Sequence, residues 1–159
     1  MLSTIRERGT KTGVVQEKYF NAFEKALNKY DTYISSVPSQ FYFDDMSSKN
    51  VMIDKGVFVG LVDLDGVAYG DYLEGIGRIK GSWHGTGYGT IYSEAVMKDL
   101  GLSESQKEIV TLYALLNRIQ WLAETGIQFN QNTSTAIDRE KVTAHEKVID
   151  AMIEELKIN

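Results

Sequence analysis

The stretch from Phe41 to Asp71 constrains the fold of this chain more than any other part. It contains two short apolar runs, Val51–Ile53 and Val57–Val62, of which the second is rich in β-branched residues. The dipeptide Lys55-Gly56 between them is a turn signal, so the two runs are predicted to pair as an antiparallel hairpin. A polar, acidic loop adjoins each outer end of this hairpin in the sequence.

The polar residues beside the hairpin suit a hard metal ion. Asp45 and Asn50 precede its first strand, and Asp63 follows its second strand. Because a hairpin brings its outer ends together, we expect these three side chains to lie within reach of one bound ion. Their oxygen atoms suit Mg²⁺ better than zinc or copper. Asp and Asn also commonly end strands, and a single such loop would carry no more meaning than that. Two acidic loops around one hairpin favour a site.

These residues resemble the catalytic core of the kinase-like phosphotransferases, the family of aminoglycoside phosphotransferases, choline kinases and homoserine kinase-like enzymes. The catalytic loop of that family has an Asp five residues before an Asn, as Asp45 and Asn50 are spaced here. A strand, a turn, a second strand and a metal-binding Asp follow, and residues 62–65 (Val-Asp-Leu-Asp) are similar to that setting. The family often continues with Gly-Asp and an apolar helix, similar to residues 69–73.

The resemblance implies a role for each of these side chains. Asp45 would be the catalytic base or would orient the hydroxyl that accepts phosphate, and Asn50 and Asp63 would hold Mg²⁺ on the phosphates of ATP. Phosphoryl transfer needs such an arrangement because positioning and charge neutralisation supply most of the rate. Asp71 would be structural and join the metal loop to the following helix. The implied partners are a nucleotide and a small molecule that carries a hydroxyl.

The chain departs from the family pattern in two places. Phe43 stands where the family usually has a His two residues before the catalytic Asp, a residue that mainly shapes the loop. In addition, the residues before the catalytic loop contain no candidate for the strand-rich lobe that covers ATP. The resemblance is therefore to the helical C-terminal lobe alone, as in a truncated enzyme, and it covers most of the chain after residue 14.

Composition limits the other possibilities. A chain of 159 residues with 43% apolar and 25% charged residues is typical of one globular domain. The net charge of −5 argues against a nucleic-acid surface and against a basic membrane patch. No cysteine is present, which excludes disulfides and thiolate-bound metal. No apolar run reaches membrane-spanning length and the N-terminus has no signal-peptide core, so a cytoplasmic protein is expected.

The rest of the chain predicts a mainly helical α+β fold, with about five helices around the hairpin. Residues 1–13 are polar and are expected to form a flexible arm, followed by one domain over residues 14–159. Apolar residues recur at helical spacing in several segments. These segments are 14–34, 72–80, 91–100, 103–122 and 136–157. The segment Ser103–Gln106 is a capping box that should start the fourth of these helices.

Three further features of the sequence carry weaker predictions. The glycine-dense segment Gly81–Gly89 is interpreted as a connector, because its spacing matches neither a P-loop nor a dinucleotide fingerprint. The polar segment Gly126–Thr135 is predicted to be a loop, and in family members the corresponding region can contribute to the acceptor site. His145 is interpreted as a surface or boundary residue of the last helix.

Two functions remain open. In the first, the chain is part of an ATP-dependent small-molecule phosphotransferase that needs an N-terminal lobe for activity. In the second, it is a catalytically inactive lobe that acts as a binding or scaffold domain. Nucleotide affinity and exposed surface separate the two. A lobe built to pack against another lobe should expose an apolar patch near the acidic loops, so a homo-oligomer or a partner that covers this face is expected. We expect the chain alone to turn over very slowly or not at all.

Overall fold

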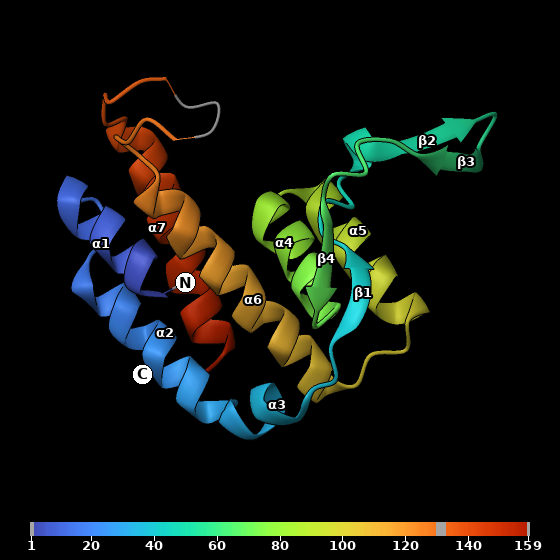
Figure 1. The fold of residues 1–159 in the computed structure, drawn as a ribbon, viewed down its shortest axis with the longest axis horizontal. Helices are drawn as coiled ribbons and strands as arrows, with labels where there is room; N and C mark the ends of the chain where they lie inside the picture. The colour runs from blue at the N-terminus through green and yellow to red at the C-terminus, as the bar shows by residue number, and fades with distance from the viewer. Residues whose placement is uncertain (1, 130–132, 159) are drawn as a thin grey trace. The chain divides into compact units, whose positions relative to one another are not determined.

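Helices make up most of the chain, and the strands form two small antiparallel sheets (Figure 1). The computed structural model describes residues 2–129 and 133–158. Within these residues there are seven α-helices, one short 3₁₀ helix and four strands. The predicted α+β class with mainly helical content is confirmed, with more helices than the five expected.

The chain divides into two compact units. Unit 1 consists of Met1–Asp31 and Leu115–Asn159, and unit 2 consists of Thr32–Ala114. One long helix, α6 (Glu104–Ala123), contributes residues to both units. No helix in the described parts of the chain has the length and apolar character needed to cross a bilayer.

Unit 1 contains four helices that share one apolar core. They are α1 (Leu2–Thr12), α2 (Glu17–Lys29), the C-terminal part of α6, and α7 (Arg139–Glu155). The largest fully buried side chains of this core come from α2, α6, α7 and the residue after α7. They are Tyr19, Phe20, Leu115, Ile119, Leu122, Ile149, Met152 and Leu156.

The first residues of the chain are more structured than their composition predicted. The flexible arm expected over residues 1–13 is instead mostly helix α1. Ile5 is its buried apolar contact, and Arg6 lies over the ring of Phe20 at 4.9 Å while its Nη2 donates to Glu24 at 2.9 Å. A single buried isoleucine in a polar segment gives no periodic signal, which is why the sequence did not predict this helix.

The helix predicted over residues 14–34 is two helices in the structure. Helix α2 ends at Lys29, Tyr30 leaves the helical conformation with φ −107° and ψ 13°, and α3 (Asp31–Ser36) follows. The apolar stripe of α2 faces the core as predicted, with Tyr19, Phe20 and the neighbouring apolar residues buried. The stripe does not continue into α3, in which no residue is buried.

The two sheets of unit 2 are antiparallel pairs. Strand β2 (Val51–Asp54) pairs with β3 (Val57–Leu61), which confirms the predicted hairpin, and its register shifts between Met52 and Ile53. Strand β1 (Gln40–Phe43) pairs with β4 (Val67–Gly70), a strand that the sequence did not predict. The inner hairpin is thus enclosed, along the chain, by the outer strand pair.

Helix α4 (Leu73–Trp83) packs so closely against its neighbours that two of its positions need glycine. A Cβ atom added at Gly77 would lie 2.5 Å from Cβ of Tyr113 and 2.9 Å from the Val110 carbonyl oxygen, both on α6. At Gly75 it would lie 2.9 Å from the carbonyl oxygen of Phe43 on β1. These contacts place α4 against the strand that leads into the first acidic loop.

The prediction of a connecting loop over Gly81–Gly89 was largely wrong. Helix α4 continues to Trp83, and α5 (Gly87–Asp99) begins after only three residues, with Thr86 as its N-cap. The backbone N–H of Gly89 donates to Oγ1 of Thr86 at 3.0 Å. Gly89 lies where the two helix ends approach closely, because a Cβ there would lie 2.2 Å from Cβ of Trp83.

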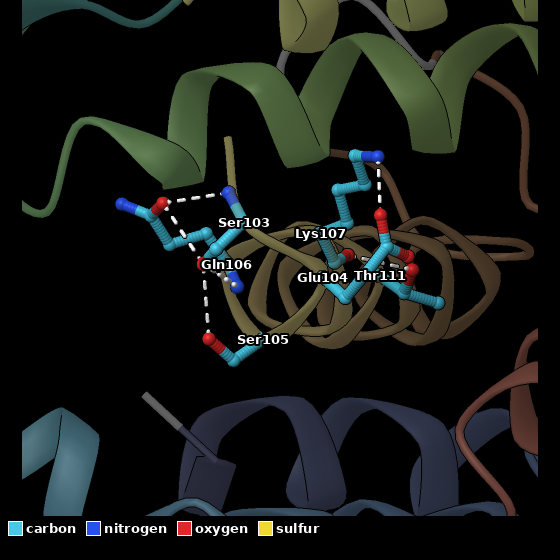
Figure 2. A network of polar contacts seen from close by, with 6 residues as sticks. All are labelled: Ser103, Glu104, Ser105, Gln106, Lys107 and Thr111. Carbon is cyan, nitrogen blue, oxygen red and sulfur yellow. Dashed lines mark hydrogen bonds and ion pairs between the residues drawn. The ribbon is translucent and has the colours of Figure 1, made fainter. Parts of the chain in front are cut away.

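The capping box at the start of α6 forms as predicted (Figure 2). The Ser103 N–H donates to Oε1 of Gln106 at 3.0 Å, and the Gln106 N–H donates to Oγ of Ser103 at 3.3 Å. Along the rest of α6 most of the large apolar side chains are buried. These side chains include Ile109, Val110, Leu112, Leu115, Ile119 and Leu122.

The last helix begins later than predicted and buries its histidine. Helix α7 starts at Arg139, because Oδ1 of Asp138 caps it by accepting hydrogen bonds from the N–H groups of Glu140 and Lys141. His145 is only 8% exposed, so its interpretation as a surface or boundary residue was wrong. The predicted loop over residues 126–135 falls partly outside the described residues, which omit 130–132.

Substitution of Gly77 by Ala should destabilise the protein. The added methyl group would overlap α6, and overpacking of this kind costs about 1–3 kcal/mol. Gly87→Ala is the matched control, because a Cβ there meets nothing within 4 Å. Urea denaturation should show a lower midpoint for Gly77→Ala and an unchanged or slightly raised midpoint for Gly87→Ala. Equal midpoints for the two variants would contradict the close packing of α4 on α6.

Burial of His145 should make stability fall in mild acid. Burial, with the charges of Arg118 and Lys141, lowers the pKa of His145 from 6.5 to about 4. The unfolded chain therefore takes up a proton first as the pH falls, and stability present above pH 6.5 is lost toward pH 4. The loss between pH 7 and pH 5 should be about 2 kcal/mol. Denaturation of the parent and of His145→Asn at both pH values measures it, and an equal pH slope in both would refute this assignment.

Candidate functional site

The β2–β3 hairpin brings the two acidic loops of unit 2 together. The N–H of Val62, just after β3, donates to the carbonyl oxygen of Asn50 at 3.0 Å. Asp63 therefore directly follows a residue that is bonded to Asn50. On the other side, the N–H of Asp44 donates to the Gly66 carbonyl oxygen at 2.6 Å and extends the β1–β4 pairing. These two backbone bonds join the end of each acidic loop to the start of the other.

Asn50 holds the first acidic loop in shape. It is 3% exposed, ends the 3₁₀ helix Ser48–Asn50, and its Nδ2 donates to the main-chain carbonyl oxygen of Asp45 at 2.9 Å. This bond fixes Asp45 relative to the start of β2. The amide oxygen Oδ1 accepts no hydrogen bond from the described residues, so it is the Asn50 atom that remains for a cation.

Asp45 is a half-buried carboxylate with cationic neighbours. Lys49 Nζ lies 3.2 Å from its Oδ2, and the N–H of Ser47 approaches its Oδ1 at 3.4 Å. Burial alone would raise the pKa of Asp45, but the bonds from Ser47 and Lys49 and the charges of Lys49 and Arg78 hold that pKa below its ordinary value. Asp45 is therefore ionised at neutral pH, which suits a residue that orients a hydroxyl group more than one that removes its proton.

Asp63 is exposed and has an unusual backbone conformation. Its φ is +61°, in the left-handed region that Asp tolerates better than most residues. A hydrogen bond with Asp65 and the charge of that carboxylate raise the pKa of Asp63, and the charge of Asp45 adds to the effect. Repulsion between neighbouring carboxylates is relieved when a cation binds between them, so the local charge favours a cation.

The donor set at this end of the hairpin is small. It consists of the Asp45 and Asp63 carboxylates, the neighbouring Asp65, and the Asn50 amide. Across the described ranges, no group of three or more His, Cys, Asp or Glu side chains is arranged to hold a metal ion. These residues therefore fit a hard cation only if the amide oxygen and the oxygens of a phosphate ligand complete its shell, as is usual for Mg²⁺.

Two contacts that support the first acidic loop were not predicted from the sequence. Arg78 on α4 pairs through Nη1 with Oδ2 of Asp44 at 2.5 Å. Tyr92 on α5 donates its hydroxyl hydrogen to the carbonyl oxygen of Met46 at 2.8 Å. Both partners lie more than thirty residues from the loop in sequence, and no local pattern connects such distant residues.

Asp71 has the structural role that was predicted for it. The residue is 7% exposed, and its Oδ2 accepts hydrogen bonds from the hydroxyls of Tyr33 at 3.0 Å and Tyr113 at 3.1 Å. Its Oδ1 accepts the N–H of Leu73 at the start of α4. Burial, together with the Asp71 carboxylate, raises the pKa of both tyrosines, so both hydroxyls remain donors. One carboxylate thereby connects α3, α4 and α6.

The hairpin carries an exposed apolar surface next to the acidic loops, as predicted. In Figure 1 it extends away from α4 and α5, two helices of the same unit. Its large apolar side chains and those of the following loop are between 42% and 64% exposed. They are Met52, Ile53, Val57, Phe58, Val59, Val62 and Leu64. Both edges of the two-stranded sheet are also unpaired in the described structure.

Comparison with known proteins does not identify the chain. No family model, curated protein or solved structure matches it. What the hairpin loops can bind must therefore be judged from their own side chains.

Removal of the Asp65 charge should lower the pKa of Asp63 toward its ordinary value. The hydrogen bond and charge of Asp65 are the largest causes of the raised pKa, and Asp65→Asn removes the charge. A carbon-detected NMR titration of the Asp63 carboxyl measures this directly. Asp54→Asn, at the turn end of β2, is the matched control and should leave the Asp63 titration unchanged. No change in the Asp65→Asn variant would mean that these carboxylates do not interact.

Proposed function

We propose that the hairpin site, defined as Asp45, Asn50 and Asp63, binds Mg²⁺ together with the phosphates of a nucleotide. The chain would then supply the metal-binding and acceptor-orienting part of an ATP-dependent small-molecule phosphotransferase related to the C-terminal lobe of kinase-like enzymes. The observation that carries the proposal is the Val62–Asn50 backbone bond, which brings the Asn50 amide and the Asp63 carboxylate to one end of the hairpin beside Asp45.

The three side chains have environments that suit three different tasks. Asn50 is buried and fixed, so its Oδ1 would be a preorganised ligand. Asp63 has a raised pKa beside Asp65 and is exposed, so it would gain from a cation and can reach one from solvent. Asp45 is ionised and positioned by Lys49, so it would accept a hydrogen bond from the acceptor hydroxyl. Bound Mg²⁺ would supply charge neutralisation on the phosphates.

The exposed apolar surface of the hairpin favours contact with a second polypeptide. Apolar side chains such as Phe58 and Val59 are more than half exposed on a sheet with two free edges. Contiguous apolar surface of this kind usually marks an interaction site. We therefore propose that a nucleotide-covering lobe, a partner chain or a second copy of this chain packs here, in the cytoplasm where Mg·ATP is available.

A catalytically inactive role has its own support. Lys49 occupies one oxygen of Asp45, and a binding or scaffold domain would need only the exposed hairpin surface. In that case Asn50 and Asp63 would shape the loops without binding a nucleotide. The two functions differ in whether the hairpin site has affinity for Mg·ATP.

Calorimetric titration of Mg·ATP into the chain separates the two functions. The phosphotransferase proposal predicts binding that needs Mg²⁺ and is weakened at least about tenfold in Asp63→Asn, since a directly coordinating charge is lost. Asn50→Ala should lose binding as well, and a circular dichroism spectrum would check that this buried substitution preserves the fold. Asp54→Asn is the matched control and should bind like the parent.

The outcomes of this titration have different meanings. Mg²⁺-dependent binding that Asp63→Asn abolishes supports the metal site and justifies a screen of hydroxyl acceptors. Absence of binding in the parent at millimolar nucleotide, or equal binding by Asp63→Asn and the parent, would contradict the proposal. The inactive binding or scaffold role would then be the better interpretation of the exposed hairpin.

A further inference from the structure

Unit 1 contains a cavity that the hairpin site does not use. It lies between the C-terminal end of α6 and the first turns of α7 and has a volume of about 520 Å³, within the range of small-molecule sites. All of its lining residues belong to unit 1. They include Trp121, Glu124, Asp138, Lys141 and His145.

His145 brings an unmatched hydrogen-bond donor to this cavity. The residue is more than nine-tenths buried, and its Nδ1 lies 3.4 Å from Nη1 of Arg118. A guanidinium group can only donate, so Nδ1 is the acceptor of this bond and the proton of the neutral ring is on Nε2. Within the described residues, Nε2 has no hydrogen-bond partner. His145 is one of the residues that line the cavity.

Lys141 adds a positive charge on the same side of α7. It lies four residues before His145, and residues at this spacing share one face of a helix. It is also in the first turn of α7, where the helix dipole favours an anion. Its ammonium group forms no ion pair with the described residues. Lys141 and His145 therefore present two adjacent donors without acceptors.

The carboxylates that line the cavity already have partners. Glu124 pairs with Nη1 of Arg8 at 3.8 Å. Asp138 accepts the N–H groups of Glu140 and Lys141 through Oδ1, at 3.0 and 3.1 Å. Their negative charge is thus offset by a guanidinium group and by the N-terminus of α7. Lys141 and His145 keep donors that no described residue accepts.

We propose that this cavity binds a small organic carboxylate. The two carboxylate oxygens would accept hydrogen bonds from the Lys141 ammonium and the Nε2–H of His145. The apolar body of the ligand would lie toward Trp121. The guanidinium carbon of Arg118 lies 5.6 Å from the centroid of the Trp121 ring. A singly charged carboxylate fits better than a doubly charged phosphate, because Glu124 and Asp138 also line the space and would repel the second charge.

The probe for this proposal is benzoate, titrated at constant ionic strength and followed by NMR. The chain has two tryptophans and two histidines, so the signals of Trp121 and His145 can be assigned by substitution of the other residue of each pair. Saturable shifts of both side chains are expected. Benzamide has the same shape without the charge, and it should bind at least about fivefold more weakly because it cannot pair with an ammonium group.

Two variants test the two donors separately. Lys141→Gln keeps a flexible polar side chain, one atom shorter, without the charge, and His145→Asn keeps an acceptor for Arg118 without the Nε2–H. Each should weaken benzoate binding about three- to tenfold, as expected for one charged or buried hydrogen bond. Lys147→Gln is the matched control, because Lys147 is an exposed lysine of α7 that does not line the cavity.

The proposal is overturned by any of three results. These are no saturable shift with benzoate, equal binding of benzoate and benzamide, or unchanged binding by Lys141→Gln. If His145→Asn fails to fold, Lys141→Gln still decides the matter, since its side chain is exposed. The result is independent of Mg·ATP binding, because these residues are in unit 1 and the hairpin site is in unit 2.

Discussion

The architecture of unit 2 depends on one buried carboxylate. Asp71 accepts hydrogen bonds from Tyr33, Tyr113 and the backbone of Leu73, and so joins three helices at the point where β4 ends. A carboxylate with several donors can remain buried where an isolated one could not. Because β4 pairs with β1, which leads into the first acidic loop, the position of that loop follows from how Asp71 holds the start of α4.

The hairpin site shows how neighbouring carboxylates can be given different properties. Asp45 receives Lys49 and lies near Arg78, whereas Asp63 faces Asp65. The pKa of Asp45 is therefore held below its ordinary value, while the pKa of Asp63 is raised above it. Asn50 connects them, because its side chain bonds to Asp45 and its carbonyl oxygen accepts the N–H of Val62. Asn50 thus links two loops whose carboxylates, Asp45 and Asp63, have pKa values shifted in opposite directions.

Two local signals in the sequence formed as predicted, whereas contacts between distant residues were not predicted. The Lys55-Gly56 turn and the Ser103–Gln106 capping box depend on residues a few positions apart, and both form as predicted. Strand β4 exists because it pairs with β1 across the whole inner hairpin, and Arg78 reaches the acidic loop from another helix. Helix α1 is likewise stabilised by contacts of Ile5 and Arg6 with the rest of unit 1, which its own composition does not reveal.

The nesting of the two strand pairs has a consequence for the order in which they form. β2 and β3 are joined by a two-residue turn, whereas β1 and β4 meet only when all the intervening chain is closed into a loop. The entropy cost of closure rises with the length of free chain, so a preformed inner hairpin shortens the loop that the outer pair must close. The inner hairpin should therefore assemble first, within microseconds, and the convergence of the acidic loops should then follow with the slower outer pairing.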